Sequence, residues 1–206
     1  MTSVYRLTAL RGIVSVLIIL FLFSLSESTT AQPMISTRVI DYFPSVILGS
    51  EVSESMSTRG SGTEFNLEFT GKRSKVVFGV SVVLEEFTIS SLEAGDADYS
   101  MSSVGFLTDL RYRFSTSPIQ PYLALQVGIN TLDVEKMSDG LEQGLTDAGV
   151  LIIPSGGFMF TIKNLLLLDL NIRSHRSMGG EIIMSDEATT IGFNGIGIGL
   201  GAGLLL

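Results

Sequence analysis

Alternation of apolar and polar residues after about residue 35 constrains the fold of this chain more than any other feature. Between residues 75 and 90, Val76, Val80 and Leu84 fall on one face, whereas Ser81 and Glu85 fall on the other. A period of two residues indicates a strand whose two faces meet different surroundings. Candidate strands of this kind cover residues 37–50, 62–70, 75–90, 98–114, 120–133, 148–162, 164–177 and 188–204.

The connections between these strands alternate in length. Short turns at 71–74, 115–118 and 163–164 follow the second, fourth and sixth strands, and longer polar loops follow the others. Short turns at one end and long loops at the other are typical of bacterial outer-membrane barrels, with both termini on the periplasmic side. We therefore predict an all-β protein, an eight-stranded antiparallel up-and-down transmembrane β-barrel.

The first residues have the pattern of an export signal. Two arginines precede an apolar stretch at 12–25, and small residues at 29–31 form a cleavage site. This stretch is shorter than the roughly 20 residues of a membrane-spanning helix. We predict a cleavable signal peptide at 1–31, followed by one outer-membrane barrel domain at 32–206.

Composition excludes several functions. The chain has no cysteine, which rules out a lipoprotein anchor, disulfides and cysteine-based metal or redox sites. Its net charge of −8 becomes −9 without residues 1–31, and such an acidic chain is a poor partner for nucleic acid. We find no metal-ligand cluster and no cofactor motif. Glycines at every second position from 195 to 203 are not followed by a helix, so they match no phosphate loop. We interpret them as a stripe that lets lumen side chains pack closely.

The polar faces of the predicted strands carry charges that would point into the barrel. An interior of eight strands is just wide enough for its side chains to fill it. Because a buried unpaired charge costs several kcal/mol, we expect these charges to pair and plug the lumen. A narrow path for an ion or solute is the alternative. The predicted polar network comprises Glu64, Glu68, Glu85, Asp109, Arg111, Arg113, Asp169 and Arg173.

Two further features concern the ends of the strands. Pro44 and Pro154 fall inside predicted strands, and proline cannot donate a hydrogen bond to the sheet. We therefore expect a bulge or a strand start near each, with the sixth strand effectively beginning near Ser155. Aromatic residues near the short turns, among them Tyr112, Phe114 and Tyr122, predict an interfacial girdle.

On these segments the chain resembles the small eight-stranded outer-membrane barrels, the group of the OmpA transmembrane domain, OmpX and the opacity proteins. The resemblance lies in the turn and strand at 120–130, the hairpin at 162–173 and the closing strand at 189–203. It implies a structural or surface-interaction protein of the outer membrane. Such barrels usually end in an aromatic residue, whereas this chain ends in three leucines.

His175 and Ser177 are weak candidates for catalysis. With a nearby carboxylate they could form a serine hydrolase site, and the pair is faintly similar to the His-x-Ser of lipid A deacylase barrels. In that family an asparagine follows the serine, where this chain has Met178. The alternation also directs both side chains away from lipid. We therefore predict that the protein is not an enzyme, and keep a lipid A-modifying hydrolase as an alternative.

Acidic residues predominate in the long loops. We expect them on the outer side of the membrane, either simply solvated or lying among lipopolysaccharide head groups bridged by divalent cations. The expected partners are outer-membrane lipid and lipopolysaccharide, together with a surface ligand held by the long loops. A soluble periplasmic barrel that binds an apolar ligand is the other alternative. The acidic loop residues are Glu51, Glu54, Glu93, Asp96, Asp98, Glu135, Asp139, Glu142, Asp147, Glu181, Asp186 and Glu187.

Overall fold

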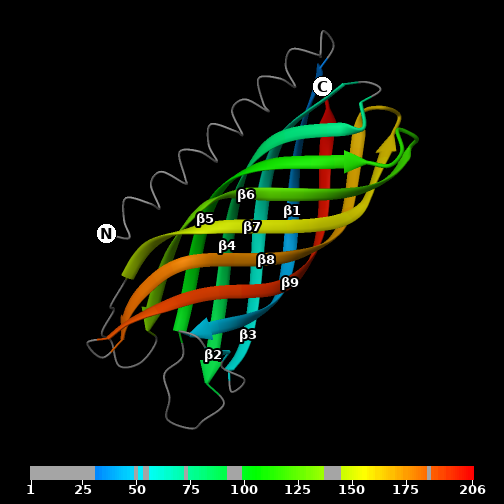
Figure 1. Cartoon of the computed structure of the whole chain (residues 1–206). Coiled ribbons are helices and arrows are strands. Elements are labelled where there is room, and N and C mark those ends of the chain that lie inside the picture. Colours follow the sequence, from blue (N-terminus) through cyan, green and yellow to red (C-terminus); the bar gives the residue numbers. More distant parts are fainter. Residues whose placement is uncertain are drawn as a thin grey trace.

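The described part of the chain forms one closed antiparallel sheet (Figure 1). The computed structural model describes residues 31–48, 51–52, 56–71, 74–91, 99–136, 145–184 and 187–206. Residues 1–30, and with them almost all of the predicted signal peptide, lie outside these ranges. The strands are β1 (Ala31–Leu48), β2 (Glu51–Val52), β3 (Met56–Gly71), β4 (Val76–Ser91), β5 (Tyr99–Arg113), β6 (Ile119–Lys136), β7 (Leu145–Ile162), β8 (Leu166–Met184) and β9 (Glu187–Leu205).

The barrel closes between its first and last strands. Sequential strands pair in the order β1, β3, β4, β5, β6, β7, β8 and β9, and β9 pairs with β1. The short β2 adds only a hairpin to the far end of β1. Near the chain end, Met34 pairs with Leu205, and the Leu206 N–H donates to the Pro33 carbonyl over 2.9 Å. The eight-stranded up-and-down prediction is confirmed. Within the described residues, no helix has the length and apolarity to cross a bilayer.

Several strands extend beyond their predicted ends. β1 begins at Ala31, since its pairing with β3 starts at Ala31 and Gly71. The expected long loop before the last strand is mostly strand, because β8 reaches Met184 and β9 starts at Glu187. Of the predicted acidic loop residues, Glu51, Glu135, Asp147, Glu181 and Glu187 lie in strands. The others, namely Glu54, Glu93, Asp96, Asp98, Asp139, Glu142 and Asp186, lie outside the described residues.

The expectation of a bulge or strand start at the two prolines is wrong. β7 runs from Leu145 through Pro154, and Pro154 pairs with Leu125 of β6 in unbroken register. On the β8 side, pairing is interrupted at Ile153 and Pro154 and resumes in the same register. Pro44 pairs with Gly195 of β9, and pairing with β3 has already ended at Tyr42. A gap in the pairing on one side therefore accommodates each proline.

The outer surface carries an apolar belt. Val39, Phe106, Leu123, Ile172 and Leu200 are each exposed by 58–63%. Polar residues border the belt at the long-loop end, where pairing joins Asp41, Ser61, Glu86, Ser102 and Asp133 across five strands.

At the short-turn end, the outward rings of Tyr112 and Phe114 meet edge to face, with centroids 5.4 Å apart. Tyr122, which we had expected in this girdle, points inward instead and is 3% exposed. Tyr122 pairs with the inward-pointing Arg113 in the β5–β6 register, and the Arg111 guanidinium lies over its ring inside the barrel.

Candidate functional site

The interior of the barrel is the one place where the predicted polar residues meet. All eight predicted network residues are buried, with exposed fractions of 9% or less. Alternation along each strand brings them there, because their neighbours in sequence point outward into the apolar belt. They come from β3, β4, β5 and β8, and the remaining strands add further polar groups.

Glu64 lies at the centre of this interior. Its two carboxylate oxygens accept hydrogen bonds from Arg38 Nη1 over 2.6 Å and from Arg173 Nη1 over 2.5 Å. Gln126 Nε2 donates to the same carboxylate over 2.8 Å. Arg38 also pairs with Asp169, which accepts the Tyr122 hydroxyl over 2.7 Å. Charge-assisted bonds of this kind are the strong ones, and here they cross the lumen from strand to strand.

Arg38 is a charged member of the network that the sequence reasoning missed. It is 3% exposed and belongs to β1, whose alternation is mixed: the outward face carries Thr37 and Asp41, and the inward face carries Met34 and Ile40. The outward-pointing residues of β1 could have placed Arg38 inside. Side chains alternate between the two faces, so Arg38, an odd number of residues from the outward Ile35, points inward.

A second group lies nearer the short-turn end. Arg111 pairs with Glu68 over 2.5 Å and with Asp109 over 3.5 Å, and its guanidinium lies 4.5 Å from the centre of the Tyr122 ring. Arg113 lies one inward position further on. It donates to Gln120 over 3.0 Å, to Thr70 over 2.6 Å and to the Ser74 carbonyl.

The far end of the interior holds the two candidate catalytic residues. His175 Nε2 lies 3.2 Å from the carboxylate of Glu85, and its ring packs against those of Tyr42 and Phe87. Ser177 receives a hydrogen bond from Asn130 Nδ2 over 3.2 Å. Both candidates are buried, and the structure thus joins His175 to an acid but gives Ser177 a different partner.

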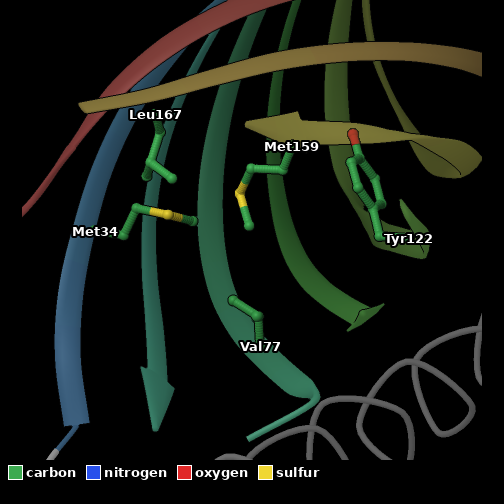
Figure 2. Packing of buried hydrophobic residues seen from close by; sticks show 5 residues of the cluster. All are labelled: Met34, Val77, Tyr122, Met159 and Leu167. Atoms are coloured by element: carbon green, nitrogen blue, oxygen red, sulfur yellow. The ribbon is translucent and has the colours of Figure 1, made fainter. Parts of the chain in front are cut away.

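Apolar side chains close the interior on the short-turn side of the Glu64 contacts. Met34, Val77, Tyr122, Met159 and Leu167 come from five strands and point toward one another (Figure 2). A void of about 10 Å³ lies between this cluster and Asp169, which is at the lower limit for a single water.

The glycines of β9 make close packing possible. A Cβ on Gly197 would lie 2.7 Å from the Tyr42 ring, and one on Gly199 would lie 2.8 Å from Arg38 Cδ. The side-chain-free stripe predicted for β9 therefore faces the bulkiest lumen residues. No group of three or more His, Asp or Glu side chains that could hold a metal occurs among the described residues.

Comparisons with known proteins agree at the level of the fold. No protein-family model matches the chain, and neither does any curated protein sequence. Among solved structures, Neisserial surface protein A has a TM-score of 0.51 at 15% identity, covering 81% of this chain and 95% of its own. The outer membrane protein OprG from Pseudomonas aeruginosa has a TM-score of 0.53 at 16% identity, covering 85% of this chain and 96% of its own.

These likenesses and the two surfaces of the barrel lead to one conclusion. The chain has the fold of the small eight-stranded outer-membrane barrels, as the resemblance implied. Its charged side chains lie inside and its large apolar side chains outside, an arrangement suited to lipid and not to water. The predicted location in the outer membrane follows from this arrangement on that fold.

Proposed function

We propose that this barrel is a closed structural element of the outer membrane that acts through its outer surface and does not conduct solutes. The central contact between Glu64, Arg38 and Arg173 carries this proposal, because it fills the middle of the interior with paired charges. The apolar cluster around Met159 blocks the same axis nearer the short turns. A conducting path would have to break the charge pairs and displace the apolar cluster.

Electrical recording in planar bilayers tests the closed lumen. The refolded barrel is expected to leave the bilayer current at its protein-free level, since the paired charges and the apolar cluster occupy the lumen. Heat-modifiable migration on an unboiled gel verifies that the same preparation is folded. Steady channels from the folded wild-type protein would contradict the proposal.

A hydrolase function is the weaker candidate. Its support is the contact between His175 and Glu85, which resembles the acid–base half of a catalytic triad. Against it, Ser177 is bonded to Asn130, and both side chains are buried away from the lipid face where a lipid substrate would lie. The variant Ser177→Ala should leave the acylation of lipid A in producing cells unchanged, and a changed acyl pattern would favour the enzyme.

The proposed partner of the outer surface is lipopolysaccharide, bridged by divalent cations. Exposed carboxylates of Asp41, Glu86 and Asp133 support this, because they lie at one level along the polar border of the belt. The triple variant D41N/E86Q/D133N should lose the Mg²⁺-dependent part of the binding of lipopolysaccharide to the purified barrel. Equal Mg²⁺ dependence of binding in wild type and variant would show that these carboxylates do not contribute to the contact with lipopolysaccharide.

A further inference from the structure

Arg113 is a buried cation that lacks an acidic partner. Its side chain is 6% exposed, yet no carboxylate of the described residues lies within ion-pair distance of it. It donates instead to the neutral oxygens of Gln120, Thr70 and Ser74. Its Nε–H has no acceptor among the described residues. The other three lumen arginines, by contrast, each contact at least one carboxylate.

A cavity adjoins this cation at the short-turn end of the barrel. It measures about 290 Å³, and its rim includes one residue from each short connection, Gly71, Thr116 and Asn164. Barrels of this fold turn this end toward the periplasm. Above the cavity, the apolar cluster closes the lumen, so the cavity is a blind mouth and not part of a channel.

The lining of the mouth cavity combines polar and apolar side chains. Arg113, Gln120 and Thr161 are among its polar residues, and Met34, Met159 and Leu205 are among its apolar ones. Ligand pockets combine apolar walls with a few placed polar groups in this way. The volume is at the lower end of the roughly 300–1,000 Å³ of such pockets, which favours a short ligand.

We propose that the mouth cavity binds a small monocarboxylate with an apolar chain. A guanidinium matches a carboxylate geometrically, since two parallel N–H groups can donate to its two oxygens. One negative charge balances the charge of Arg113, whereas a doubly charged phosphate would exceed it. The alkyl chain lies against the methionine and leucine side chains. This binding site is separate from the proposed outer surface at the opposite end of the barrel.

The first experiment needs no variant. The ¹⁵N-labelled wild-type barrel in lipid nanodiscs is titrated with hexanoate, hexan-1-ol and inorganic phosphate, and the arginine Nε–H signals are recorded. Hexanoate is expected to shift one of these signals saturably, and hexan-1-ol and phosphate are expected to leave it in place. No saturable shift with hexanoate, or an equal shift with hexan-1-ol, would overturn the proposal.

A variant then assigns the signal. Arg113→Gln should weaken hexanoate binding at least tenfold while keeping a hydrogen-bonding side chain beside Thr70. Lys75→Gln, the matched control, removes an exposed cation near the same end and should retain wild-type affinity. Wild-type affinity in folded Arg113→Gln would show that Arg113 does not hold the carboxylate, and an equal loss in Lys75→Gln would show attraction by charge alone. Either result would refute the site. If Arg113→Gln does not fold, the titration of the wild type decides by itself.

Discussion

At the scale of single residues, Glu64 is the side chain on which the interior depends most. It is fully buried and is the only carboxylate that pairs with Arg173 among the described residues, and it shares Arg38 with Asp169. Neutralising it would leave Arg173 without a counter-charge inside the barrel. Losing one partner of a buried pair typically costs about 3–5 kcal/mol, because the other charge remains buried.

We expect Glu64→Gln to lower the free energy of unfolding by about 3–5 kcal/mol. Urea titration of the barrel in lipid vesicles, followed by gel migration, measures this change. Glu86→Gln is the matched control, since Glu86 is exposed at the polar border, and it should shift stability by no more than about 0.5 kcal/mol. Equal effects of the two substitutions would contradict a central role for the buried carboxylate.

At the scale of elements, the hairpin of β7 and β8 shows how backbone geometry sets a strand boundary. Lys163 and Asn164 have φ angles of 52° and 54°, and the Leu165 N–H donates to the Ile162 carbonyl over 3.1 Å. The two φ angles match those of a type I′ turn at Ile162–Leu165, which lies within the three-residue connection between the paired residues Ile162 and Leu166. Asparagine tolerates this conformation, whereas lysine is strained in it.

Lys163→Asn should therefore stabilise the barrel by up to about 1 kcal/mol, as the strain at this position is relieved. The urea midpoint of unfolding in vesicles reports the change. Lys75→Asn, at an exposed position next to another short turn, serves as the control for loss of a positive charge and should have little effect. A midpoint that falls in Lys163→Asn would show that the lysine side chain stabilises the turn through a contact that outweighs its backbone strain.

At the scale of the whole molecule, the apolar belt distinguishes a membrane barrel from a soluble one. Val80 is 45% exposed and lies six residues along β4 from Glu86, which marks the polar border. In water an arginine at such an exposed position would be harmless. In a bilayer, a charge facing lipid at mid-depth costs about 2–4 kcal/mol, falling to about 0–1 kcal/mol near the interface.

Val80→Arg should consequently destabilise the barrel in vesicles by about 2–4 kcal/mol, and Ser102→Arg at the polar border by about 1 kcal/mol or less. The difference between the two unfolding free energies is the quantity to compare. Equal, small effects would mean that the belt does not face lipid, and would favour the alternative of a soluble periplasmic barrel.

The sequence by itself determined which face of most strands points inward and which connections are short. Alternation is a local property: the directions of Val80 and Ser81 follow from their being neighbours in one strand. The same reasoning placed Asp109, Arg111 and Asp169 on the inner face, where the structure has them. It was weakest in β1, where polar residues lie on both faces, and Arg38 was missed there.

Only the tertiary structure decided which inward side chains meet. Arg38 and Asp169 are 131 residues apart, and they become partners because β1 and β8 both flank β9 in the closed barrel. Which side chains face each other across the lumen depends on the register shifts between all eight strands added together. No single segment of the sequence contains this information. For the same reason the pattern could not reveal that Arg113 has no carboxylate opposite it. Pairing across a barrel depends on the register of the closed sheet. Alternation specifies only whether a side chain points into the lumen or out of the barrel.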